Sequence, residues 1–235
     1  MSEWKLKRFW KSATAAPCDG GFEVLLDGRR VKTPAKSPLI LPSLALAEAI
    51  AAEWDAQDDA VDPGQMPLTR TANSAIDKVA HQFEDVASML AEYGGTDLLC
   101  YRAEAPLGLQ AAQAAAWDPL LDWARVRYDA PLMTGQGVMH VMQPQASLDN
   151  LAAPLRAMSV FELAGFHDLV TISGSLIIAL ALAEAQIDLD TAWAAARVDE
   201  DWQAQEWGHD DEATAHAALK QAAFGEALAF LNLSR

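Results

Sequence analysis

An Asp27-Gly28 dipeptide lies between two short apolar runs near the start of the chain and limits the backbone conformations open to this region. Glycine accepts the positive φ of a type I′ turn, so this dipeptide predicts a hairpin that joins strands at Phe22–Leu26 and Arg30–Thr33. Further strands are expected at Trp4–Trp10, where bulky and basic residues alternate, and at Leu39–Leu41. The beginning of the chain therefore predicts a small sheet.

Beyond this sheet, apolar residues recur at helical spacing. Ser43 is a suitable N-cap for a helix that runs to about Gln57. Within the later helical region, Asp118-Pro119 is typical of an N-cap followed by the first residue of a helix. One apolar stretch is expected to break at Ser173-Gly174-Ser175. The predicted later helices are Pro67–Val79, Phe83–Tyr93, Gln110–Tyr128, Ser147–Met158, Phe161–Ala185, Thr191–Glu206 and Asp211–Leu231.

Together these patterns predict an α+β fold, in which a small N-terminal β-rich two-layer domain precedes a larger all-α helical bundle. We expect the first domain at residues 1–78, with the hairpin and one helix, and the α-helical domain at residues 79–235. A chain of 235 residues can bury a sizeable core without covalent cross-links. Cys18 and Cys100 match no metal or redox spacing, which favours a reduced compartment.

The net charge of −16 is unevenly distributed and restricts the partners that the protein can bind. Residues 1–36 carry a net charge of +4, whereas residues 37–235 carry −20. An acidic body of this kind disfavours nucleic acid and anionic membrane surfaces as partners. A cationic protein surface is easier to accommodate. The most apolar run, Leu176–Ala183, is too short to span a bilayer and predicts a buried helix, so no integral membrane segment is expected.

An acidic and aromatic stretch, Arg197–Trp207, places a carboxylate where a helix would otherwise have an apolar residue. In a continuous helix, five residues spaced by three or four positions share one narrow face: Trp193, Ala196, Glu200, Ala204 and Trp207. Asp199 and Asp201 would point about 100° to either side of Glu200. A carboxylate on an aromatic face needs a cation, a donor or a partner surface, because burying it unpaired is costly. Arg197 could supply that cation locally, so the spacing leaves a local ion pair and a binding surface both open.

Signatures of catalysis are absent from the sequence. There is no Gly-x-Ser-x-Gly elbow, no Walker lysine and no helical His pair, and His209 beside Asp210 is typical of a solvated helix start. We therefore expect no catalytic site, no cofactor and no metal. The alternative is a small-molecule enzyme of the helical domain that uses Asp97, His167 or Glu200 as its acid or base.

Seven stretches stand in a single order along the chain: RFWK (Arg8–Lys11), LLDGRRVKTPAKSPL (Leu25–Leu39), MPLTRTANSAID (Met66–Asp77), YGGTDLLCYRA (Tyr93–Ala103), WDPLLDWA (Trp117–Ala124), FELAGFHDLVTISGSLI (Phe161–Ile177) and EDWQAQEWG (Glu200–Gly208). Together they resemble the ATP synthase assembly factor 2 family, whose members are chaperones for the alpha subunit of the F1 sector.

The resemblance implies a chaperone that is not an enzyme, with a small β-rich domain joined to a helical bundle. Such a protein binds the free F1 alpha subunit and prevents its aggregation until the beta subunit takes its place. The essential acidic residue of the family falls in the run before Trp202-Gln203, where Glu200 is the best match and Asp199 and Asp201 lie one residue away. Trp202 and Trp207 are the expected apolar anchors for the partner.

The expected location follows from the start of the chain. The matching stretch begins at Arg8, which leaves no room for a transit peptide, so we expect a bacterial cytoplasmic protein. In a eukaryote the same protein would be expected in the mitochondrial matrix.

Besides the chaperone and the small-molecule enzyme, the third possible function is a helical scaffold without a chaperone role.

Overall fold

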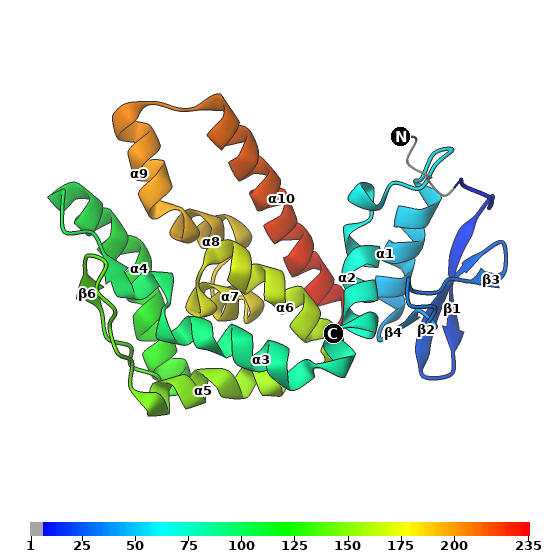
Figure 1. The fold of residues 1–235 in the computed structure, drawn as a ribbon, viewed down its shortest axis with the longest axis horizontal. Coiled ribbons are helices and arrows are strands. Elements are labelled where there is room, and N and C mark those ends of the chain that lie inside the picture. Colours follow the sequence, from blue (N-terminus) through cyan, green and yellow to red (C-terminus); the bar gives the residue numbers. More distant parts are fainter. Residues whose placement is uncertain (1–6) are drawn as a thin grey trace. The chain divides into compact units, whose positions relative to one another are not determined.

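The computed structural model describes residues 7–235, which form two compact units (Figure 1). The first unit contains the described residues up to Phe83, together with Ser159–Gly165 and Ala229–Arg235. The second contains Glu84–Met158 and Phe166–Leu228. The contacts thus assign two late segments to the N-terminal unit, and the expected domain boundary after residue 78 stays a prediction. The α+β fold, a small strand region followed by helices, is confirmed.

The first unit is built on an antiparallel sheet, in which β2 is the central strand and pairs with each of the others. Its strands are β1 (Ala13–Cys18), β2 (Gly21–Leu26), β3 (Arg29–Arg30) and β4 (Ile40–Leu41). Asp27 and Gly28 link β2 to β3 with φ of 47° and 78°, so the predicted turn with positive φ at both positions is confirmed.

Two strand predictions differ from the structure. β1 was not predicted, because its sequence ATAAPC lacks the bulky alternation that indicates a strand. The strand expected at Trp4–Trp10 lies partly outside the described residues, and from Lys7 onward it forms only an isolated bridge between Lys7 and Ala60. The sheet therefore takes its edge from a segment with weak local preference, which the pairing with β2 holds in place.

Helix α1 (Leu44–Asp55) covers the sheet and supplies much of the core of the first unit. Ser43 caps it as predicted, because its Oγ accepts a hydrogen bond from the N–H of Leu46 at 3.0 Å. The same hydroxyl donates to the carbonyl of Leu233. Val24, Leu46 and Phe230 are fully buried in this core, so the end of the chain is part of the N-terminal unit.

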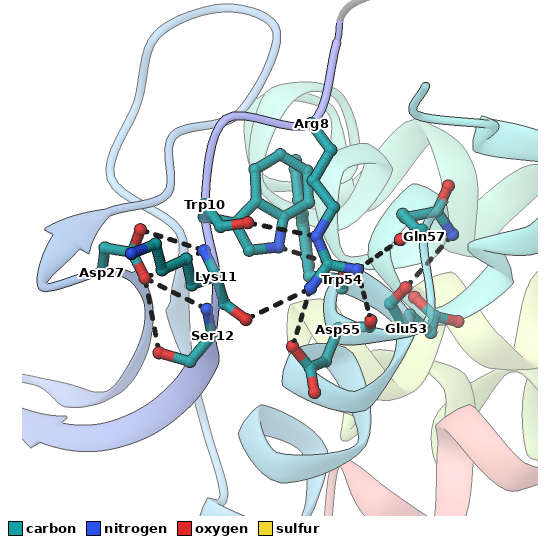
Figure 2. A network of polar contacts seen from close by, with 9 residues as sticks. All are labelled: Arg8, Trp10, Lys11, Ser12, Asp27, Glu53, Trp54, Asp55 and Gln57. Carbon is teal, nitrogen blue, oxygen red and sulfur yellow. Dashed lines mark hydrogen bonds and ion pairs between the residues drawn. The ribbon is translucent and has the colours of Figure 1, made fainter. Parts of the chain in front are cut away.

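Arg8, the first residue of the RFWK stretch, ties the segment before β1 to the end of α1 (Figure 2). Its guanidinium donates to the carbonyls of Trp10 at 3.1 Å and Asp55 at 2.8 Å, and to the carbonyls of Lys11 and Gln57. It also forms an ion pair of 3.2 Å with the Asp55 carboxylate. A planar fork with five N–H donors suits this cluster of carbonyls, so Arg8 has a structural role.

A second polar contact in Figure 2 fixes the hairpin turn to the same segment. The backbone N–H groups of Ser12 and Lys11 each donate to the Asp27 carboxylate at 3.0 Å. These hydrogen bonds to the charged form lower the pKa of Asp27 below its ordinary value. Asp27 therefore shapes the turn through its backbone and anchors it through its side chain.

The second unit is predominantly helical. Its α-helices, with the bounds of the whole elements, are α3 (Phe83–Glu92), α4 (Leu107–Tyr128), α5 (Gln145–Arg156), α6 (Val160–Ser173), α7 (Leu176–Ala183), α8 (Leu189–Ala196), α9 (Val198–Trp207) and α10 (Asp211–Leu233). Short parallel strands β5 (Tyr101–Arg102) and β6 (Gly135–Gln136) pair beside them. Helix α2 (Pro67–Asp77) belongs to the first unit. Among the helices of residues 7–235, none is long and apolar enough to cross a membrane.

The predicted break at Ser173-Gly174-Ser175 separates α6 from the fully buried α7. Gly174 has a φ of 68°, and Ser175 caps α7 by accepting from the N–H of Ile178 at 3.0 Å. Asp97 is completely buried beside this break and accepts hydrogen bonds from the Ser175 hydroxyl at 2.7 Å and from the Ile177 N–H at 3.1 Å. Burial nevertheless raises the pKa of Asp97 to about 6, since these hydrogen bonds only partly offset desolvation.

The prediction that Asp118-Pro119 begins a helix is wrong. Pro119 lies inside the 22-residue helix α4, which starts earlier, at Leu107. Asp118 instead forms an ion pair of 2.7 Å with Arg102, whose guanidinium stacks over the ring of the buried Trp117 at 5.2 Å. The helix continues through the proline because packing of Trp117 and Leu120 holds both of its halves in the core.

Candidate functional site

The candidate site is an open groove of about 840 Å³ in the second unit, between α9 and α10 and beside the end of α8. In Figure 1, α9 and α10 are the orange and red helices joined by the segment Gly208–Asp210. Trp193 lines it from α8, whereas Glu200, Ala204 and Trp207 line it from α9. Helix α10 contributes Ala213, Ala217 and Lys220 to the other wall, among other residues.

The groove stays open because α9 packs mainly against α4 on its other side. The indole of Trp202 lies against Gly108 so closely that a Cβ at Gly108 would be 2.4 Å from its Cη2 atom. Asp199 accepts a hydrogen bond of 2.6 Å from the Nε2 of Gln113, a buried residue of α4. Trp202 and Asp199, both expected to bind a partner, thus hold α9 on α4.

Helix α9 begins at a break that the sequence pattern did not reveal. The predicted continuous helix Thr191–Glu206 is wrong, because Arg197 adopts φ −125° and ψ 16° and separates α8 from α9. The local pair considered between Arg197 and Glu200 does not form in the described structure. Arg197 instead pairs with Asp201 at 3.2 Å and stacks over the ring of Trp193 at 5.4 Å.

Glu200 is left exposed in the wall of the groove. Within residues 7–235 its carboxylate makes no hydrogen bond and no ion pair. Trp207, the last residue of α9, is 82% exposed, whereas Trp202 is half-buried. Despite the break, Trp193, Glu200, Ala204 and Trp207 of the predicted face line the same groove, whereas Ala196 does not line it. The three acids therefore differ in kind: Asp199 and Asp201 have partners within the chain, and Glu200 is available.

The α10 wall contains Lys220, a charged residue that was not predicted from the sequence. Asp210 lies just before α10 and caps it, because its side chain accepts a hydrogen bond of 2.7 Å from the N–H of Ala213. Lys220 lies in the same wall, is exposed and makes no ion pair with any described residue. No local pattern distinguishes Lys220 from an ordinary surface lysine, because its significance depends on the groove that two helices create.

Asp97, His167 and Glu200, the residues of the alternative enzyme hypothesis, do not form one site. Asp97 is buried beside α7, where it binds backbone and hydroxyl donors. His167 is half-exposed on α6 and its Nδ1 lies 2.7 Å from the carboxylate of Asp168. Neither forms a hydrogen bond or ion pair with Glu200 in the part of the chain that the structure describes. The three groups are therefore not arranged as an acid and base pair.

Other features of the described residues bear on the needs of a metal site and of a small-molecule site. No group of three or more His, Cys, Asp or Glu residues between positions 7 and 235 could hold a metal ion. A smaller hollow of about 350 Å³ lies at the sheet of the first unit, beside Cys18, Glu23 and Arg30. Glu23 and Arg30 form an ion pair of 2.8 Å with each other, and Asp19 and Lys32 also line the hollow.

Exposed apolar side chains gather in the connection between α4 and α5. Met133, Val138, Met139 and Met142 are all more than half exposed, and residues 130–148 contain no charged side chain. Long flexible methionines form adaptable apolar surfaces. This exposed apolar connection was not predicted from the sequence, although a long uncharged stretch in an acidic chain would have indicated it.

The chain is similar to one protein family and to several proteins of solved structure. The ATP12 chaperone protein family matches the chain over residues 7–125. The chain is 52% identical to Atp12 from Paracoccus denitrificans, with a TM-score of 0.95 over 99% of this chain and 100% of that one. An aspartate-to-lysine mutant of P. denitrificans Atp12p matches with 51% identity and the same TM-score of 0.95 over the full length of both chains. The mitochondrial protein atp12 of Schizosaccharomyces pombe is 25% identical over 219 residues, which cover 88% of this chain and 75% of that protein.

An open groove with an unpaired acid and exposed tryptophan is typical of a protein that binds another protein. The chain belongs to the ATP12 chaperone family. It is a chaperone of ATP synthase assembly, and the resemblance found in its sequence is confirmed.

Proposed function

We propose that the protein binds the unassembled alpha subunit of F1 through the groove between α9 and α10 and releases it to the beta subunit. The observation that carries this proposal is Glu200, an exposed carboxylate without an internal partner, in a groove that also contains Trp193 and Trp207. A free alpha subunit exposes the apolar surface that later contacts beta, and such a surface drives aggregation. The chaperone shields that surface while Glu200 pairs with a cation of the alpha subunit.

The contacts of the site residues suggest different roles for them. Trp207 is the exposed apolar anchor, whereas Trp202 and Asp199 position α9 on α4. Asp201 orients Arg197 over Trp193. We therefore assign direct contact to Glu200 and Trp207, and a positioning role to Asp199, Asp201 and Trp202. The small-molecule enzyme is not favoured, since its candidate residues do not converge.

The test is co-expression of this chain with the F1 alpha subunit, followed by measurement of soluble alpha subunit. We expect a soluble one-to-one complex that dissociates when the beta subunit is added. Glu200→Lys should lose the complex, because it places a cation opposite the proposed cation of the alpha subunit. Glu206→Lys is the matched control: Glu206 is exposed on the same helix, makes no ion pair with described residues and does not line the groove.

The outcomes separate the proposal from its alternatives. Equal aggregation of the alpha subunit with and without the chaperone would refute it. Equal binding by folded Glu200→Lys and Glu206→Lys would remove Glu200 from the interface. Tight binding to an already assembled F1 complex, without any effect on free alpha subunit, would indicate a scaffold. We place this activity in the bacterial cytoplasm, or in the mitochondrial matrix for a eukaryotic protein.

A further inference from the structure

The two walls of the groove carry unpaired charges of opposite sign. Glu200 lies in the α9 wall and Lys220 in the α10 wall, and neither forms an ion pair with the other or with any other described residue. The remaining charged side chains of the walls are engaged within the chain: Arg197 pairs with Asp201, and Asp210 caps α10. The groove therefore presents one free acid and one free base to whatever enters it, together with the exposed rings of His209 and His216.

The walls also restrict the secondary structure of the occupant. Both are α-helices, whose backbone N–H and C=O groups are bonded internally, so neither wall can pair with an added β-strand. A helix satisfies its own backbone and can enter such a groove without leaving polar groups unpaired. Small side chains at Ala204, Ala213 and Ala217 face the groove and permit the close approach that helix packing requires. Trp193 and Trp207 add apolar surface for an amphipathic face.

We propose that the groove binds an amphipathic helix of the client that carries a basic residue toward Glu200 and an acidic residue toward Lys220. This inference rests on the proposed function, because it specifies the element of the alpha subunit that the same site binds. Two opposite charges on facing walls also fix the orientation of the helix. A helix inserted the other way round would place like charges together on both walls, which is unfavourable. Lys220 is therefore a specificity-determining residue of the groove.

The charge arrangement is tested by the affinity of the full-length protein for purified F1 alpha subunit at low and high salt. We expect Lys220→Glu to weaken binding about ten-fold at low salt, equivalent to about 1.4 kcal/mol, and less at high salt. Lys78→Glu is the matched control, because Lys78 is exposed, makes no ion pair with described residues and lies outside the groove. It changes the net charge equally and should leave the affinity within two-fold.

Wild-type affinity in the folded Lys220→Glu variant, with Glu200→Lys still defective, would overturn this inference and leave the proposed function intact. Failure of the unaltered chain to bind alpha subunit would refute both. A photoreactive benzoylphenylalanine in place of Gln203 or Gln221, which are exposed and line the groove, tests the helix itself. We expect each probe to label residues spaced by three or four positions within the same client segment. Labelling at alternate residues would indicate a strand and overturn the inference.

Discussion

The buried carboxyl group of Asp97 should make the stability of this protein depend on pH in a defined direction. Asp97 is completely buried, and burial raises its pKa from 3.8 to about 6. A carboxyl group with a raised pKa in the folded state stabilises the protein below its unfolded pKa, where it is protonated in both states. This contribution is lost as pH rises through the folded pKa, because the folded state must then carry a buried charge.

The size of the effect follows from the shift. At about 1.4 kcal/mol for each pKa unit, a shift from 3.8 to about 6 corresponds to about 3 kcal/mol. About 2 kcal/mol of this should disappear between pH 4 and pH 7, since the loss is already under way at pH 4. Above pH 7 the contribution of Asp97 should be constant. The stability therefore changes with the ionisation of Asp97 in the mildly acidic pH range, where protonation of other carboxylates also affects the free energy of unfolding.

A comparison with Asp97→Asn isolates this group. The variant cannot ionise, so the free energy of unfolding of the wild type minus that of the variant should fall by about 2 kcal/mol from pH 4 to pH 7. Urea unfolding followed by circular dichroism measures both values at each pH. Asp58→Asn is the control, because Asp58 is exposed and makes no hydrogen bond with described residues, and its difference should stay flat.

Two results would refute the reasoning about Asp97. A flat difference between wild type and Asp97→Asn would show that its pKa is ordinary in the folded protein. A difference that rises with pH would show that the hydrogen bonds from Ser175, Ile177 and Leu99 outweigh desolvation. Asparagine also brings donors toward these backbone N–H groups, which lowers stability at every pH but does not create a slope.

Three further predictions concern stability. Asp199→Ala should lower the free energy of unfolding by about 1–3 kcal/mol, because it leaves the buried Nε2 of Gln113 without its acceptor. The neighbouring Glu200→Ala should change it by less than about 0.5 kcal/mol. Equal losses for the two variants in urea unfolding would contradict this distinction. Gly21→Ala should lower the melting temperature strongly, because Gly21 has a φ of 151° and a Cβ there would lie 2.3 Å from the carbonyl oxygen of Leu41. An unchanged transition in calorimetry would mean that β4 can move away from this position. Arg8→Lys should lower the free energy of unfolding by about 2–4 kcal/mol, because an ammonium group cannot make the several hydrogen bonds that the guanidinium donates to backbone carbonyls and to Asp55. Arg29→Lys changes an exposed arginine and should leave the stability unchanged in the same chemical unfolding assay. Comparable losses in both variants would refute the special role of Arg8.

Part of the candidate site was predictable because it depends on residue type and spacing within one segment. Glu200, Trp193 and Trp207 were identified from their shared helical face, and all three line the groove. The reasoning nevertheless assumed one continuous helix, and the chain breaks at Arg197. The roles of Asp199 and Trp202 could not be separated from that of Glu200, because their partners Gln113 and Gly108 are distant in the sequence.

Some elements follow from the preferences of a few neighbouring residues. Asp27-Gly28 specifies a turn through its backbone preference, Ser43 caps a helix through its own hydroxyl, and Gly174 ends α6 by adopting a positive φ. Other elements depend on long-range contacts that outweigh local preference. Pairing with β2 makes β1 a strand, core packing carries α4 through Pro119, and the packing of α9 and α10 places Lys220 and Glu200 in one groove. Local signals depend on a few consecutive residues, whereas the groove depends on how whole helices pack.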